Sequence, residues 1–98
     1  MSLQDRYDFE YLVNEAEKMV IDELDHQLDM NKDKTICVCQ DCVLDMAAFA
    51  LNTLKPAYRV SLLGKLYAGS MKDTDYGKEV EKAVSTAIEK ISSNPAHD

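Results

Sequence analysis

Three cysteines lie within six positions of one another, Cys37, Cys39 and Cys42, in the pattern CxCxxC. The last pair forms the CxxC step that places two thiolates on one metal ion, about 2.3 Å from each sulfur. An odd, clustered set of cysteines in a reducing compartment favours metal ligands over disulfides. Two alternatives are three ordinary reduced cysteines in a loop and a redox-active CxxC, but no βαβ pattern surrounds the motif. We therefore expect a zinc site.

A structural zinc takes four ligands, and two histidines are available for the fourth position. His97 in the C-terminal tail is the better candidate, because His26 falls near the end of a predicted helix. Asp41, a water molecule and a neighbouring chain are the remaining alternatives. Thiolates dominate this ligand set, and the sequence has neither an HExxH nor an HxE signature. A structural zinc that pins the cysteine loop is therefore expected, not a catalytic one.

Hydrophobic periodicity predicts long helices on both sides of the cysteines. Apolar residues recur at three- and four-residue steps over Asp8–Leu28, which predicts an amphipathic helix capped by its first residue. A similar pattern predicts another helix over Asp75–Ser92, with Thr74 as the candidate cap. Residues 29–35 are polar and lack periodicity, which predicts a loop before the cysteines.

A further helix is expected directly after the cysteines. Asp41 is its candidate cap, and the helix runs through Asn52 or Leu54, before Pro56, because proline disfavours a helical conformation in the residue preceding it. This helix is apolar on nearly every side, so it should be central to the core. Residues 58–70 are ambiguous, since their leucines suggest a short connecting helix and their glycines weaken it.

Length and composition bound the architecture. The 98 residues form one domain, residues 1–98, and 3 Gly and 2 Pro are too few for an all-β sandwich or barrel. We expect an all-α fold of three long helices and a short connecting helix, stapled by zinc. Three helices leave the strongly apolar central helix hard to cover within one chain, which favours a homodimer.

We expect neither a secretory signal nor a membrane-spanning helix. The N-terminus has no apolar stretch behind a basic start, so we expect no secretory signal. The longest unbroken apolar run, Met46–Leu51, is far shorter than the roughly 20 residues of a membrane helix. A cytoplasmic protein that does not enter the membrane is expected.

Charge is distributed unevenly along the chain. The formal net charge of -7 argues against nonspecific nucleic-acid binding, which needs a basic surface. The only charged residues between positions 46 and 72 are nevertheless positive, and we call them the basic island: Lys55, Arg59, Lys65 and Lys72. With Tyr58 and Tyr67, the basic island has side chains that can bind a phosphate and stack on a base. A solvated surface whose sign is accidental is the alternative.

A set of short motifs resembles the late-competence development protein ComFB family. They are the run Cys37-Val-Cys-Gln-Asp-Cys42-Val-Leu-Asp45, the run Ala50-Leu51-Asn52 and the run Lys55-Pro56-Ala57-Tyr58-Arg59-Val60. Family members share the CxCxxC motif, an aspartate three residues on, an ALN run and a PxY step. The resemblance extends upstream to Asn14-x-x-Glu17-x-x-Val20 and covers roughly residues 13–60.

The resemblance implies a small, dimeric all-α protein whose structural zinc is held by three cysteines and a fourth ligand from the C-terminal region. This sequence has no fourth cysteine, which directs attention to His97. Some members of the family are reported as receptors for cyclic di-GMP. In this chain the candidate ligand-binding residues are three cations of the basic island and one of the two tyrosines: Lys55, Arg59, Lys65 and Tyr58.

Two polar residues of the predicted central helix are candidate supporting residues. Asp45 and Asn52 lie seven positions apart, so they share one helix face. Asp45 is expected to hydrogen-bond Arg59 and orient it, or to support a zinc ligand. The alternative is structural, with Asp45 as a partner of the helix dipole and Asn52 as a C-cap.

Two functions from different classes follow. The leading hypothesis is a non-enzymatic signalling or adaptor protein with a structural zinc and cyclic di-GMP at the basic island. The alternative is a protein-interaction module, of competence or another pathway, that has no small-molecule ligand and whose acidic faces meet a basic partner. Nothing in the sequence resembles a nucleophile with a base and an orienting group, so an enzyme is the weakest hypothesis.

Overall fold

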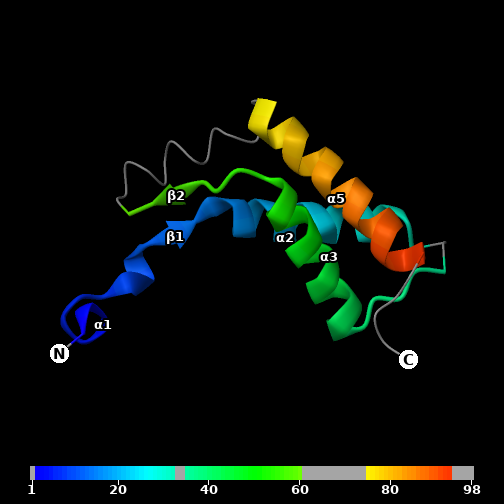
Figure 1. Cartoon of the computed structure of the whole chain (residues 1–98). Helices are drawn as coiled ribbons and strands as arrows, with labels where there is room; N and C mark the ends of the chain where they lie inside the picture. Colours follow the sequence, from blue (N-terminus) through cyan, green and yellow to red (C-terminus); the bar gives the residue numbers. More distant parts are fainter. Residues whose placement is uncertain (1, 33–34, 61–74, 94–98) are drawn as a thin grey trace.

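Three long helices form the body of the molecule in a computed structural model that describes residues 2–32, 35–60 and 75–93. They are α2 (Glu15–Met30), α3 (Gln40–Thr53) and α5 (Asp75–Ser93), and each packs against the other two (Figure 1). The predicted fold class and its three long helices are confirmed. The predicted short connecting helix falls mainly on residues outside the described ranges, and Tyr58–Arg59 at its start form the strand β2.

The periodicity predicted that the first long helix begins at Asp8, but residues 8–14 are not part of it. The N-terminal segment contains the helical turn α1 (Leu3–Arg6), the 3-10 turn η1 (Phe9–Tyr11) and the strand β1 (Val13–Asn14). Asp8 caps η1 and not the long helix, because its side chain accepts a hydrogen bond from the Glu10 N–H at 3.0 Å. Figure 1 shows this segment leading away from the helical body.

The strand pair explains why the long helix begins at Glu15. β1 pairs with β2 in antiparallel register, Val13 opposite Arg59 and Asn14 opposite Tyr58. Asn14 then caps α2, since its side-chain oxygen accepts from the Ala16 N–H at 3.1 Å. Extended backbone before this cap excludes the longer helix.

The central helix α3 begins two residues earlier than predicted. Cys39 is its N-cap, whereas Asp41, the predicted cap, lies inside the first turn. There its carboxylate interacts favourably with the positive end of the helix dipole. The C-cap is Leu54, which agrees with the predicted end of the helix. Thr74, the candidate cap of α5, lies outside the described residues.

The core fills the space between the three helices. Its fully buried side chains include Val20 from α2, Cys42 and Met46 from α3, and Val84 from α5. A polar link joins α2 to α5, where the Gln27 amide donates to the backbone carbonyl of Glu81 at 3.0 Å. One cysteine of the predicted metal site is therefore part of the hydrophobic core.

Candidate functional site

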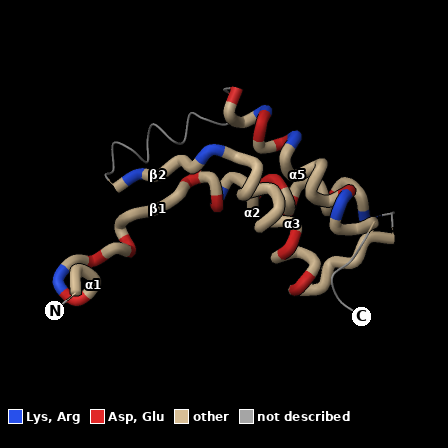
Figure 2. The backbone as a smooth tube through the Cα atoms, in the orientation of Figure 1, with Lys and Arg blue, Asp and Glu red and all other residues tan. Residues whose placement is uncertain are grey.

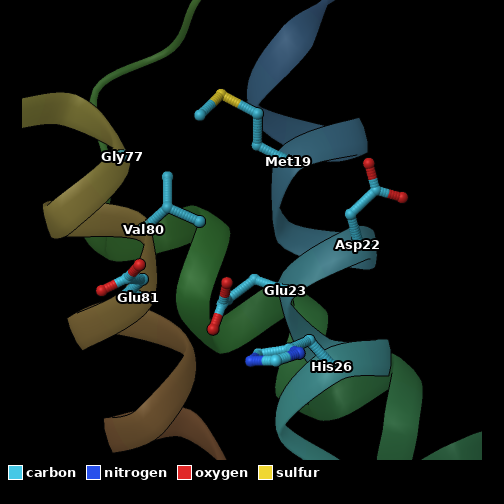
Figure 3. A pocket seen from close by; sticks show the side chains of 7 residues that line it. All are labelled: Met19, Asp22, Glu23, His26, Gly77, Val80 and Glu81. Atoms are coloured by element: carbon cyan, nitrogen blue, oxygen red, sulfur yellow. The ribbon is translucent and has the colours of Figure 1, made fainter. Parts of the chain in front are cut away.

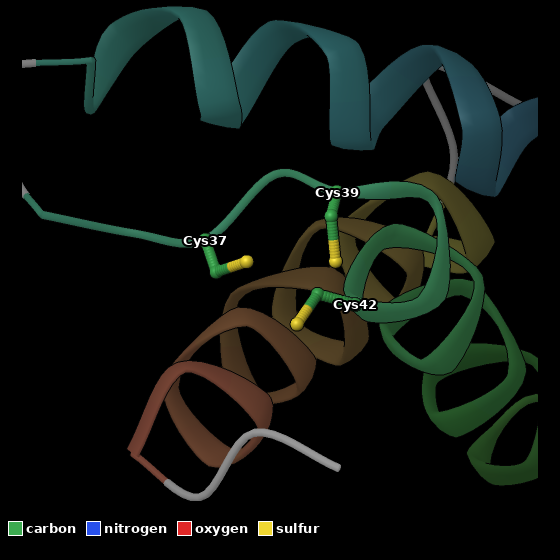
Figure 4. Close-up of side chains that lie close together, drawn as sticks. All are labelled: Cys37, Cys39 and Cys42. Atoms are coloured by element: carbon green, nitrogen blue, oxygen red, sulfur yellow. The ribbon is translucent and has the colours of Figure 1, made fainter. Parts of the chain in front are cut away.

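The three cysteine side chains converge where the loop before α3 meets the first turn of that helix (Figure 4). Cys37 comes from the loop and is half-buried, Cys39 is the exposed N-cap, and Cys42 is buried within the helix. Their three sulfur atoms all lie within 4.8 Å of one another. The CxCxxC spacing therefore gives a single cluster, as predicted.

Within the cluster, the pKa of one thiol is lowered and that of another is raised. The pKa of Cys39 is below its ordinary value of 9.0, chiefly because the backbone N–H of Cys42 hydrogen-bonds the sulfur, and further because the side chain of Cys37 does so. Burial raises the pKa of Cys42 to about 12, and the two neighbouring thiols add to the rise. Cys39 is thus the readier thiolate, whereas Cys42 needs a compensating cation to ionise.

The donor set fits a zinc ion. In a tetrahedral zinc site with bonds of about 2.3 Å, neighbouring sulfurs are about 3.8 Å apart. The three sulfurs, all within 4.8 Å of one another, are close to that separation. Three soft thiolates are ligands that zinc accepts, and a fourth ligand would close the shell.

No described histidine or carboxylate joins the three sulfurs. His97 lies outside the described residues, so its role stays a prediction. His26 is exposed on α2 and lines a different cavity, of about 270 Å³, between α2 and α5 (Figure 3). Figure 3 shows acidic side chains on its walls, among them Glu23 and Glu81.

The basic island is described only over its first part, at and before β2. Lys55 is exposed, and Tyr58 is 62% exposed. Arg59 is different, because its guanidinium Nε donates to the carboxylate of Glu15 at the start of α2. Lys65, Lys72 and Tyr67 lie outside the described residues. Figure 2 shows the two described cations of the island on the segment that follows α3.

Comparison with known proteins places the fold in a family. The family model described as late competence development protein ComFB matches residues 13–95. The chain belongs to the ComFB family. The solved structure of ComFB from Bacillus subtilis matches with a TM-score of 0.70 and 23% sequence identity, over 87% of this chain and 92% of that one, a likeness that shows the fold. No curated protein matches this chain.

Two residues to which the sequence analysis gave no role, Asn14 and Glu15, hold the start of α2 against β2 in this ComFB-family chain. The Asn14 side chain accepts a second hydrogen bond, from the Ala57 N–H at 2.8 Å, and the Glu15 N–H donates to the Ala57 carbonyl at 2.8 Å. Glu15 is buried and also accepts from Arg59. Asn14 followed three residues later by Glu17 is an N-cap pattern that would have indicated the helix start.

The supporting roles given to the α3 residues are partly wrong. Asp45 was expected to orient Arg59, but the partner of Arg59 is Glu15. The structural alternatives fail as well, because Asp45 lies beyond the first turn and the C-cap is Leu54 and not Asn52, which is exposed. Support of a zinc ligand by Asp45 stays a prediction.

No helix among residues 2–32, 35–60 and 75–93 is both long and apolar enough to span a membrane. In particular, α3 is the most apolar of the long helices, yet it has only 14 residues. A helix of this length reaches about 21 Å, short of the roughly 30 Å of a bilayer core.

Proposed function

We propose that this ComFB-family chain is a non-enzymatic adaptor protein whose cysteine motif holds a structural zinc. The observation that carries the proposal is the convergence of three sulfurs from the loop and from α3 within 4.8 Å. A zinc ion on these sulfurs joins the loop to the first turn of α3, whose Cys42 reaches into the core. A thiolate-rich shell with a fourth protein ligand leaves no open position for a substrate, which is typical of structural sites.

The test is the metal content of the purified protein. We expect about one zinc per chain, and we expect a chelator to lower the melting temperature, because structural zinc contributes free energy to the folded state. Cys42→Ser is expected to lose the metal, whereas Ser85→Ala, a change outside the cluster, retains it. Metal-free wild-type protein that melts like the native form would overturn the proposal.

His97 is proposed as the fourth ligand. The support is the absence of any described histidine or carboxylate beside the three sulfurs, together with the exposure of His26 at a different cavity. His97→Ala should therefore weaken zinc retention, and His26→Ala should not. Equal zinc retention in the two variants would assign the fourth position to water or to a neighbouring chain.

A homodimer is part of the same proposal. Several large apolar side chains are exposed on the described N-terminal segment, among them Tyr11 at 67% and Tyr7 at 56%. Light scattering over a range of concentrations tests this proposal. A monomer at all concentrations would refute the dimer without affecting the zinc proposal.

Cyclic di-GMP binding at the basic island is the second candidate function. The exposed Lys55 and the 62% exposed Tyr58 support it, because the ligand needs cations for its two phosphates and a flat surface for its purines. Arg59 is engaged with Glu15, so a phosphate would have to compete with that carboxylate. We therefore expect Lys55 to matter more than Arg59 among the described cations.

Calorimetric titration with cyclic di-GMP at about 100 μM tests this candidate. Lys55→Glu should abolish the heat of binding, and Lys78→Glu, on the exposed face of α5, is the matched control. No heat with wild-type protein would leave the alternative of an interaction module without a small-molecule ligand. That alternative predicts a basic partner for the acidic faces.

A further inference from the structure

An apolar groove runs between α2 and α3, and no residue of α5 lines it. The groove has a volume of about 580 Å³. Its walls include Leu24 and Leu28 from α2 and Val43 and Leu51 from α3. Ile21 and Leu44 also line it, and they are 59% and 57% exposed. Large apolar side chains on facing helices are thus left without cover within the described part of the chain.

The charges around the groove are negative. Glu17, Asp22 and Asp25 belong to its lining, and none of the described residues that line it is a lysine or an arginine. Both helices that form it have an excess of negative charge: α2 carries six carboxylates and one lysine, and α3 carries two carboxylates and no basic residue. An apolar floor with an acidic edge favours an occupant that is apolar along one side and basic beside it.

We propose that this groove binds an amphipathic helix of a partner protein, with lysines or arginines flanking the apolar face of that helix. The inference rests on the adaptor function proposed above and names the surface and chemistry of the partner. From Glu17 to Leu28 the α2 wall rises about 16 Å, at 1.5 Å per residue. That length takes about three turns of a bound helix, enough for apolar anchors at positions i, i+4 and i+7.

Charge argues against two other occupants. A second copy docked face to face by a two-fold axis would set the carboxylates of α2 and α3 against the same carboxylates, and like charges in contact are unfavourable. A cyclic dinucleotide carries two phosphates, which the edge formed by Asp22 and Asp25 would repel. The groove is therefore distinct from the described part of the basic island, Lys55 and Arg59, neither of which lines it.

The experiment uses two synthetic 18-residue peptides with the same amphipathic helical pattern, one of leucine and lysine and the other of leucine and glutamate. Full-length, zinc-loaded protein should bind the lysine peptide and not the glutamate peptide, and the affinity should fall as salt is raised. Ile21→Gln combined with Leu44→Gln should weaken binding of the lysine peptide at least tenfold. Val60→Gln, a change at a 64% exposed position outside the groove, should leave it within twofold.

The acidic edge needs its own variants, because a protein of net charge -7 attracts any basic peptide. Asp22→Asn combined with Asp25→Asn should weaken binding about fivefold. Glu79→Gln combined with Glu89→Gln removes the same charge from exposed positions of α5 and should change binding less than twofold. Equal losses in the two pairs would show attraction by net charge alone and overturn the inference.

Two further measurements separate this inference from the proposed function. If wild-type protein is a dimer that Leu44→Gln converts to a monomer, a second copy occupies the groove and the inference is overturned. Zinc content and helicity are measured for every variant. Groove variants that keep both and still bind the lysine peptide overturn the groove inference and leave the zinc adaptor intact. Metal-free native protein overturns the zinc proposal whatever the peptide does.

Discussion

Replacing Arg59 by methionine should destabilise the fold, although sequence reasoning assigned this residue to ligand binding. Its guanidinium pairs with Glu15, and the two side chains are only 20% and 10% exposed. Methionine keeps most of the apolar stem, so the change removes the charge and the hydrogen bond while limiting the loss of packing. The Glu15 carboxylate is then left buried without its cation.

The magnitude follows from this burial. Removing one partner of a fully buried ion pair costs about 3–5 kcal/mol, whereas an exposed pair contributes about 0–1 kcal/mol. The Arg59–Glu15 pair lies between these limits and nearer the buried one, so Arg59→Met should lower the free energy of unfolding by about 2–3 kcal/mol. Glu15→Gln should cost about 1 kcal/mol, because Arg59 is the more exposed partner and the amide oxygen still accepts a hydrogen bond.

A double-mutant cycle tests the pairing itself. The free energy of unfolding is measured by urea denaturation, followed by circular dichroism, for the wild type, both single variants and the double variant. The double variant should cost about 1–2 kcal/mol less than the sum of the singles, because it leaves no unpaired charge. Lys55→Met is the control, expected to stay within about 0.5 kcal/mol. A cost below about 0.5 kcal/mol for Arg59→Met, or additive singles, would refute the structural role of the pair.

Three further perturbations test the capping, packing and titration described above. Asn14→Ala should lower the free energy of unfolding by about 1–2 kcal/mol in urea melts, since it removes the cap of α2 and the acceptor for the Ala57 N–H. Met46→Ala, at a side chain with 0% exposure, should cost about 2–5 kcal/mol in the same assay, and a smaller cost would contradict its place in the core. Burial and the nearby Glu79 raise the pKa of Tyr76 from its ordinary value of 10.0, so the folded state holds the phenolic proton to a higher pH than the unfolded state. The free energy of unfolding should therefore fall as the pH rises above 10. A Tyr76→Phe variant with the same fall would contradict this role of Tyr76.

Hydrophobic periodicity was sufficient to predict the three long helices, because each buries one continuous stripe in a shared core. Helix starts were predicted less well. Residues 8–14 continue the apolar spacing of α2, but the pairing of β1 with β2 keeps them extended. That pairing joins segments more than forty residues apart, so a pattern read along one segment does not reveal it. The cap at Asn14 was the local signal.

The candidate sites also differ in how well local sequence predicts them. The cysteines are predictable because all three lie in one short segment, so their spacing alone brings the sulfurs together. The partner of Arg59 was predicted wrongly, as Asp45, since the sequence analysis sought it on the central helix. The true partner, Glu15, precedes Arg59 by 44 residues and approaches it through the strand pair. Ion pairs of this kind depend on tertiary structure and not on spacing.

The proposed zinc site and the proposed groove use different faces of α3. Cys42 and Leu44 are two residues apart, which turns their side chains by about 200° around the helix axis. Cys42 accordingly points into the core at 1% exposure, and Leu44 stands in the groove at 57% exposure. A zinc ion on the inward face would fix the start of α3 against the loop without touching an occupant of the outward face. The proposed metal would thus stabilise the helix that forms one wall of the groove, and partner recognition would depend on the apolar and acidic side chains of α2 and α3.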